Sequence, residues 1–165
     1  MMTSKTYEII LDKFIYGGEA MGRLPAPDGE PRNRAVFVPY ALPGERVRIE
    51  LTFEKRGFAR AKLLEVLEAS PERIAPKCAH FGECAGCQYQ HLPYESQLRV
   101  KEDILRDQLT RIGKIDDPPV NEIIPSSEFW HYRNQMDFQL GKGAEFPNIL
   151  EIEECHLPVP ALNDF

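Results

Sequence analysis

A chain of 165 residues with 42% hydrophobic and 28% charged residues has the composition of a soluble globular protein, with room for one full domain or two small ones. It has no apolar run long enough to span a bilayer, and residues 1–5 lack the apolar core of a signal peptide, so we expect a cytoplasmic protein without membrane contact. The net charge of −6 is uneven: residues 1–77 carry 13 Lys and Arg against 11 Asp and Glu, and residues 78–165 carry 7 against 15. A basic amino-terminal half permits an RNA-binding surface there without requiring one.

Residues 1–68 predict a domain of five short strands. The strand segments are 6–14, 19–24, 35–38, 45–51 and 58–67. Val47, Ile49 and Leu51 alternate with polar residues, the pattern of a half-buried strand, and turn signals such as Gly57 separate the segments. The pattern suggests a small barrel or sandwich, and because about 60 residues cannot build a large core, a closed barrel makes the most of the apolar area.

Residues 69–165 predict a second domain of α+β class, so the chain as a whole is mainly β or α+β. Residues 70–76 contain two prolines and form the linker. Residues 93–112 predict the one clear helix, which Pro93 begins and Gly113 ends. Its apolar face consists of Leu98, Leu105, Leu109 and Ile112. Strand-like composition follows at 120–124, 130–140 and 149–152, and the apolar helix face needs a partner.

All four cysteines of the chain are candidates for one metal site. Cys78, Cys84 and Cys87 have the spacing C-x5-C-x2-C, and Cys155 lies far downstream. In the cytosol such a set favours metal binding over disulfides, and thiolates select zinc, copper(I) or iron–sulfur clusters. Three clustered cysteines with one remote cysteine are typical of iron–sulfur ligation, whereas structural zinc sites pair two short C-x2–4-C units. Two alternatives remain: a zinc site in which a neighbouring histidine is a ligand, and four cysteines that are unrelated to one another.

The residues around these cysteines resemble a known family. Segment 78–101 reads Cys-x-His-Phe-Gly-x-Cys-x-Gly-Cys-Gln-x-Gln-His-Leu-x-Tyr-x-x-Gln-Leu-x-x-Lys, which resembles the RNA uracil-C5 methyltransferases that carry an iron–sulfur cluster, the bacterial ribosomal-RNA type. Tyr132-Arg133-Asn134 and Cys155-His156-Leu157 match later motifs of that family. The five-stranded segment looks like its TRAM domain, an OB-like RNA-binding barrel.

The resemblance implies that Cys78, Cys84, Cys87 and Cys155 bind a [4Fe-4S] cluster in a central domain, residues 69–165, that helps to hold structured RNA, ribosomal RNA above all. It also implies that the helix at 93–112 packs on a methyltransferase domain that binds S-adenosylmethionine. We therefore expect the amino-terminal part of an S-adenosylmethionine-dependent RNA methyltransferase. By itself this part should be inactive, because uracil-C5 methylation needs a cysteine nucleophile and all four cysteines are assigned to the cluster.

RNA contacts are expected from cations and aromatic side chains near the strand turns of the barrel. The candidates are Arg23, Arg32, Arg34, Lys55, Arg56, Phe58 and Arg60, with Arg133 beside the cysteine domain. The alternative for each is an ordinary solvated or salt-bridged side chain. Two other functions stay open at this point: a standalone zinc-binding RNA module without catalysis, and a small electron-transfer protein.

Overall fold

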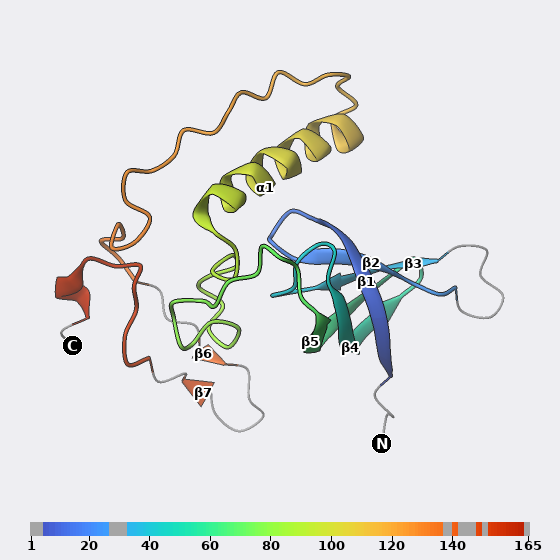
Figure 1. The fold of residues 1–165 in the computed structure, drawn as a ribbon, viewed down its shortest axis with the longest axis horizontal. Helices are drawn as coiled ribbons and strands as arrows, with labels where there is room; N and C mark the ends of the chain where they lie inside the picture. Colours follow the sequence, from blue (N-terminus) through green and yellow to red (C-terminus); the bar gives the residue numbers. More distant parts are fainter. Residues whose placement is uncertain (1–4, 27–32, 137–139, 142–147, 150–151, 164–165) are drawn as a thin grey trace.

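The computed structural model of the chain describes residues 5–26, 33–136, 140–141, 148–149 and 152–163. It shows a β-barrel, then a loop-rich segment, a helix, and a long return segment (Figure 1). The barrel strands are β1 (Thr6–Phe14), β2 (Ala20–Leu24), β3 (Arg34–Val38), β4 (Arg46–Lys55) and β5 (Phe58–Glu68). They close in the order β1-β2-β3-β5-β4, so the predicted five-stranded barrel is confirmed.

The barrel interior is filled by alternate residues of its strands. Neighbouring strands are antiparallel except β3 and β5, which run parallel. The core contains Val36, Val38, Val47, Ile49 and Ala59, each fully buried. Gly22 of β2 fits because a Cβ there would lie 2.9 Å from the Ile10 carbonyl oxygen of β1. Each buried Val or Ile contributes about 1.5–3 kcal/mol, so this small core depends on nearly every inward position.

A buried ion pair joins the barrel to the linker. The Glu45 carboxylate is fully buried, and Arg73 donates to its two oxygens at 2.5 and 2.7 Å. The backbone amides of Leu42 and Ser70 donate to the same carboxylate, and Arg73 also donates to the Tyr40 carbonyl. Burial alone would raise the pKa of Glu45, but the hydrogen bonds and the charge of Arg73 outweigh it and lower that pKa.

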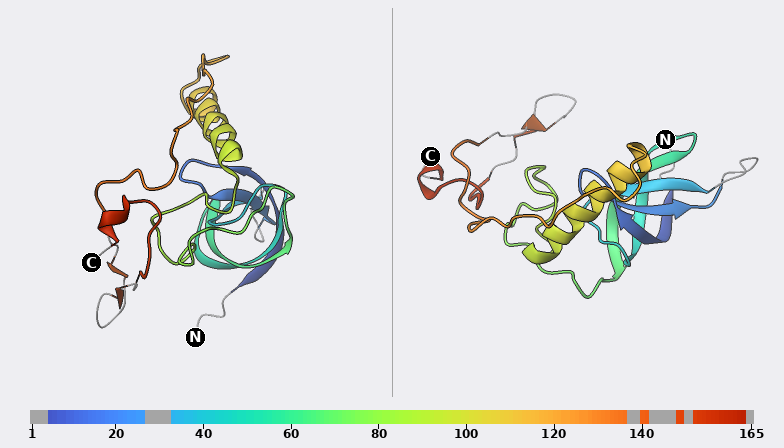
Figure 2. Two further views of the ribbon diagram at one scale, coloured as in Figure 1. Left: turned by 60° about the vertical axis from the view of Figure 1, so that its left-hand side comes forward. Right: turned by 90° about the horizontal axis from the view of Figure 1, so that it is seen from above.

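The predicted helix is present at its expected position. Helix α1 (Tyr94–Asp107) continues into one π-helical turn, η1 (Gln108–Ile112). The left view of Figure 2 shows it standing beside the barrel. The Lys13 ammonium of β1 lies 2.7 Å from the Asp107 carboxylate, and Arg99 pairs with Glu72 of the linker at 2.7 Å. Two ion pairs thus connect the helix to the barrel and to the linker.

The other side of the helix is only partly covered. The return segment runs back along it, with the Ile123 amide donating to Glu102 and the Ser126 amide donating to the Tyr94 hydroxyl. Among the residues of α1, all of which are described, only Ser96 is buried. Leu105 and Ile112 of the predicted apolar face remain 49% and 63% exposed. Packing of this face on a methyltransferase domain therefore stays a prediction.

The strand predicted at 130–140 is wrong over residues 130–136, residues 137–139 lie outside the described residues, and Leu140 belongs to the short strand β6 described below. Residues 130–136 bend, and His131 has a left-handed φ of 55°, which interrupts an extended strand. A single bridge pairs Arg133 with Pro158, supported by the bond from the Arg133 amide to the Leu157 carbonyl at 2.9 Å. Residues 120–124 form no strand either.

The carboxyl-terminal elements are short. They are β6 (Leu140–Gly141), paired with β7 (Asn148–Ile149), and a 3₁₀ turn, η2 (Pro160–Leu162). Of the strand predicted at 149–152, Ile149 lies in β7, residues 150–151 lie outside the described residues, and Ile152 is not in a strand. Within the described ranges, no helix is both long and apolar enough to cross a bilayer.

Candidate nucleic-acid interface and cysteine site

One outer face of the barrel combines aromatic rings with cations. The face, called the barrel face below, consists of Arg23, Phe37, Phe53, Lys55, Phe58 and Arg60. Strand register places these residues together, because Phe37 is opposite Arg60, and Lys55 is opposite Phe58. In β3 and β5 the inward neighbours of these residues fill the core, so strand alternation turns Phe37, Phe58 and Arg60 outward. In β4 a register shift between Leu51 and Phe53 brings Phe53 and Lys55 to the same outer face, opposite Arg60 and Phe58.

The three phenylalanines of the barrel face form a continuous aromatic platform. The Phe58 ring centroid lies 6.0 Å from that of Phe37 and 5.9 Å from that of Phe53. The Lys55 ammonium lies 5.5 Å from the Phe53 centroid, and the Arg60 guanidinium lies 5.9 Å from that of Phe37. Phe53 is 42% exposed. Flat rings beside cations can stack bases and attract phosphates at one surface.

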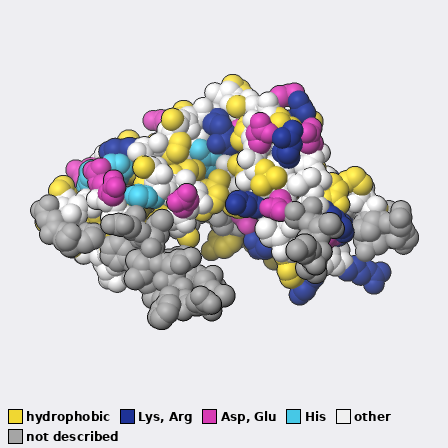
Figure 3. Space-filling model, turned by 90° about the horizontal axis from the view of Figure 1, so that it is seen from below, with side chains coloured by type: hydrophobic (Ala, Val, Ile, Leu, Met, Phe, Trp, Pro, Cys, Tyr) yellow, Lys and Arg dark blue, Asp and Glu magenta, His cyan; other side chains and the backbone are white. Residues whose placement is uncertain are grey.

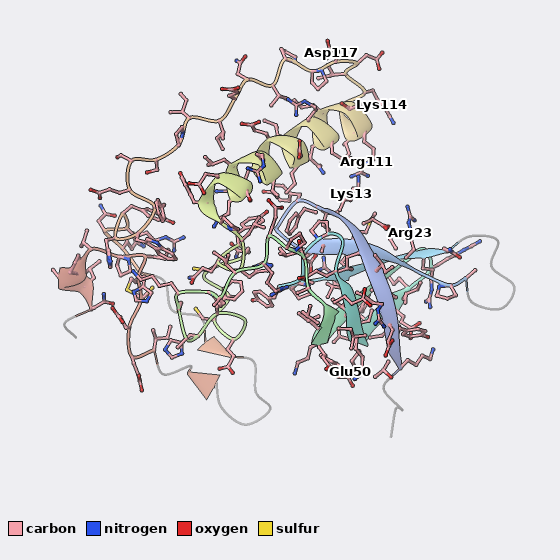
Figure 4. The ribbon with its side chains drawn as sticks, in the orientation of Figure 1. Lys13, Arg23, Glu50, Arg111, Lys114 and Asp117 are labelled. Carbon is pink, nitrogen blue, oxygen red and sulfur yellow. The ribbon has the colours of Figure 1, made fainter. Side chains whose placement is uncertain are left out.

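The sequence-predicted RNA contacts fall into two groups. Arg23, Lys55 and Arg56 are exposed, and no salt bridge between described residues involves them. Figure 4 shows Arg23 projecting from the barrel. Arg60 is exposed but pairs with Glu19 at 2.6 Å. Arg32 lies outside the described residues.

Arg34 differs from the other candidates. Only 8% of it is exposed, and its guanidinium donates to Glu54 at 2.8 Å. Together with a weaker bond from Lys5, this contact lowers the pKa of Glu54. Arg34 thus forms a structural ion pair with Glu54. The alternation of β3 indicates this inward position, because Arg34 has the same parity as the buried Val36 and Val38.

Phe37 and Phe53 are the members of the barrel face that sequence reasoning missed. The signal was available in Val36-Phe37-Val38, where a large ring occupies the outward position between two core valines. Viewed from below, Lys and Arg side chains lie over the barrel end together with acidic side chains, whereas His and further acidic side chains lie at the opposite end (Figure 3). Many of the barrel cations are thus paired with carboxylates, as Arg46 is with Glu68.

The structure brings all four cysteines to one small cavity. Cys78, Cys84, Cys87 and Cys155 line a space of ≈ 30 Å³, although they come from two segments far apart in the sequence. Burial raises the pKa of the Cys87 thiol, and charges on the other three cysteines raise it further. Among the described residues, no three His, Cys, Asp or Glu side chains lie close enough to share a single metal ion.

Backbone and side-chain hydrogen bonds fix the segments that carry the thiols. The Gly86 amide donates to the Cys84 sulfur at 3.4 Å, and the Cys78 amide donates to the Gln90 side chain at 2.9 Å. Asn163 exchanges two hydrogen bonds with the backbone of Cys155, at 3.0 and 3.2 Å. Hydrogen bonds therefore anchor the segment of the remote cysteine as well as the loop.

Aromatic packing joins the cysteine loop to the barrel. Tyr40 of the barrel lies 5.2 Å from Phe81 of the loop, and Phe81 lies 5.2 Å from His91, centroid to centroid. His91 is fully buried. Burial, aided by the charge of Arg73, lowers the pKa of His91 to about 4. This imidazole is therefore a neutral packing residue at neutral pH.

Burial of neutral His91 should make the protein lose stability in acid. Its pKa is about 4 when folded and 6.5 when unfolded, so only the unfolded chain gains a proton between these values. Stability is thus complete above pH 6.5 and falls by about 3 kcal/mol as the pH falls to 4. Urea titrations of the wild type and of His91→Leu between pH 6.5 and 4 should show that the free energy of unfolding falls more steeply in the wild type. An equal fall in both proteins would contradict the lowered pKa of His91.

The chain is similar to a known domain family and to proteins named RNA methyltransferases. Residues 2–64 match the TRAM domain, so the amino-terminal barrel is of TRAM type. Over 169 residues the chain is 36% identical to an "Uncharacterized RNA methyltransferase" of Aquifex aeolicus. This match covers 99% of this chain and 38% of that protein. It is 46% identical over 113 residues to the 23S rRNA (uracil(1939)-C(5))-methyltransferase RlmD of Xanthomonas oryzae pv. oryzae, covering 68% of this chain and 25% of that protein.

A solved structure has a similar fold. The tRNA (uracil-54, C5)-methyltransferase of Pyrococcus abyssi, determined with S-adenosyl-L-homocysteine, superimposes with a TM-score of 0.58 at 22% identity. The match covers 94% of this chain and 34% of that one. The chain thus spans well under half the length of the RNA methyltransferases to which it is similar.

Proposed function

We propose that this chain is the RNA-holding, cluster-binding amino-terminal part of an S-adenosylmethionine-dependent RNA uracil-C5 methyltransferase. The observation that carries the proposal is the barrel face, a row of neighbouring aromatic rings on a TRAM-type barrel, with Arg23 and Lys55 in no salt bridge between described residues. Similarity to proteins named RNA methyltransferases supports the enzyme class, and similarity to RlmD favours ribosomal RNA as substrate. Methyl transfer itself belongs to a methyltransferase domain, on which the exposed helix residues Leu105 and Ile112 would pack.

In the proposal, the four cysteines hold a [4Fe-4S] cluster. The support is that all four thiols border one cavity, that thiolates are the ligands iron–sulfur clusters use, and that the Gly86 amide already donates to a cysteine sulfur. The cluster would tie the loop at 78–87 to the segment at Cys155 and so order the domain beside the barrel. No residue of this chain is assigned to catalysis.

The barrel face is tested by RNA binding. We expect Phe53→Ala to weaken binding of structured RNA by about 5- to 100-fold, the effect of removing a stacking ring. A Lys55→Ala, Arg56→Ala variant should weaken binding at low salt and flatten the salt dependence, because two phosphate contacts are lost. Fluorescence anisotropy with a labelled ribosomal-RNA hairpin at several salt concentrations measures both effects.

The matched control is Lys114→Ala. Lys114 has no salt bridge among the described residues, and Figure 4 places it at the far end of the helix. This variant should bind RNA as the wild type does. Equal loss of affinity in Lys114→Ala and in the barrel-face variants would show a non-specific charge effect and refute the barrel face as the binding surface.

A further inference from the structure

The side chain of Gln90 connects two of the four cysteines. The Cys78 amide donates to the carbonyl oxygen of this side chain at 2.9 Å. That bond fixes the orientation of the side-chain amide, because a backbone N–H can bond only to the oxygen of the group. The NH₂ group therefore remains as a donor, and it forms a hydrogen bond with the Cys87 thiol. One side chain thus contacts the first and the last cysteine of the loop at 78–87.

The backbone next to Gln90 is fixed. His91 is fully buried and Leu92 is 2% exposed, so the chain is anchored directly after Gln90. The Leu92 amide donates to the Tyr89 carbonyl at 3.0 Å, and the His91 carbonyl accepts a bond from the Ile74 amide of the linker at 3.1 Å. Because its backbone is held in this way, the Gln90 side chain can hold the two cysteines in defined places.

The bond from Gln90 acts on the charge of the Cys87 sulfur. Burial raises the pKa of the Cys87 thiol, whereas the bond from Gln90 opposes this effect and lowers it. The donor therefore stabilises negative charge on the sulfur. A sulfur that ligates an iron–sulfur cluster carries such charge, and it carries more when the cluster is reduced, so a donor at this atom favours the reduced form.

Gln90 also lies at the boundary between two cavities. Gln90 and Cys87 line both the cysteine cavity of ≈ 30 Å³ and a neighbouring cavity of ≈ 340 Å³. Solvent reaches the larger cavity, because Phe129 and Tyr132 in its lining are 46% and 54% exposed. A shorter or apolar side chain at position 90 would therefore bring water closer to the cysteines and leave the Cys78 amide without its acceptor.

The other two cysteines are held by different groups. The Gly86 backbone amide donates to the Cys84 sulfur, and Asn163 exchanges two hydrogen bonds with the backbone of Cys155. A backbone donor such as that of Gly86 survives a side-chain substitution. Gln90 is therefore a position at which the hydrogen bonding of loop cysteines can be changed while all four thiols are kept.

We propose that Gln90 is a positioning residue of the cysteine site: it holds Cys78 and Cys87 in place as ligands and, through its bond to the Cys87 sulfur, raises the reduction potential of the bound cluster. An amide suits both tasks because it has one acceptor and one donor group, whereas a carboxylate only accepts and an aliphatic side chain does neither. This inference rests on the proposed function, since it requires the cluster.

The test measures iron release and reduction potential in the full chain, purified anaerobically. Gln90→Leu removes both hydrogen bonds. We expect this variant to release iron to a ferrous chelator about 10-fold faster or more, since groups that orient metal ligands commonly change metal affinity by about 10- to 100-fold. We also expect a lower reduction potential in a dye-mediated titration followed by visible absorbance, because the donor to the Cys87 sulfur is lost.

The matched control is Gln88→Leu. Gln88 is exposed, and its side-chain amide donates to the Ala85 carbonyl at 3.0 Å and not to a thiol. The control thus removes the same group two residues away. Its iron release and its reduction potential should equal those of the wild type.

Gln90→Glu separates the two bonds and replaces Gln90→Leu if that variant retains no iron. Its carboxylate can still accept the bond from the Cys78 amide but cannot donate to Cys87. Iron release should therefore change less than in Gln90→Leu, while the reduction potential still falls. Gln88→Glu adds the same charge without touching that bond. An equal fall in potential in Gln88→Glu would show an effect of charge and overturn the role of the bond to Cys87.

The outcomes separate this inference from the proposed function. A cluster that keeps its iron and its reduction potential in both Gln90 variants would overturn the inference and leave the proposed cluster in place. Faster iron release at an unchanged potential would overturn the role of the bond to the Cys87 sulfur. Wild-type protein without a cluster would overturn the inference and the cluster of the proposed function together.

Discussion

Replacing Glu45 by alanine should lower the free energy of unfolding by about 3–5 kcal/mol, a large part of the stability of a small domain. The carboxylate is fully buried and accepts two bonds from Arg73, whose side chain is 23% exposed. Its loss would leave that guanidinium and the amides of Leu42 and Ser70 without their acceptor. Urea denaturation followed by circular dichroism measures the change.

The matched control for this prediction is Glu65→Ala. Glu65 also forms an ion pair, with Arg48 at 2.6 Å, but both partners are about half exposed, at 55% and 44%. Such a surface pair contributes about 0–1 kcal/mol because water screens it. Both variants remove one glutamate carboxylate from the barrel. A loss in Glu45→Ala no larger than that in Glu65→Ala would show that the buried pair does not hold barrel and linker together.

Replacing Cys155 by serine should abolish the iron–sulfur cluster that we propose for the four cysteines. Anaerobically purified wild-type protein is expected to contain about four iron and four sulfide per chain and to absorb visible light. Cys155 brings the one thiol from outside the loop at 78–87, so Cys155→Ser should remove most of the iron and colour. Val159→Ala, in the same segment and 37% exposed, should retain both.

Metal analysis of the wild type also decides between the remaining functions. Colourless protein with one zinc per chain would refute the cluster and favour the zinc-binding RNA module. A cluster with reversible reduction but no RNA affinity would favour the electron carrier. A cluster together with salt-sensitive RNA binding is the result that the proposed function requires.

The sequence determined the local elements. Alternation at Val47, Ile49 and Leu51 predicted a strand that is part of β4, and 3.6-residue spacing predicted the helix at 93–112, which the structure has as α1 and η1. These succeed because side-chain periodicity is a local property of the backbone. The prediction at 130–136 failed because strand-like composition cannot show that His131 takes a left-handed φ or that the partner is an irregular segment.

The tertiary structure decided which charges and rings are available. Closure of the barrel buried Arg34 against Glu54 and turned Phe37 and Phe53 outward beside Lys55. Folding also joined Glu45 to the linker and brought Cys155 to the cavity that the three cysteines of the loop line. The physical reason is that the partner of a charge and the exposure of a ring depend on long-range packing, which no window of neighbouring residues contains. Composition supplied the cysteines and the cations, and the fold selected which of the cations face RNA in our proposal.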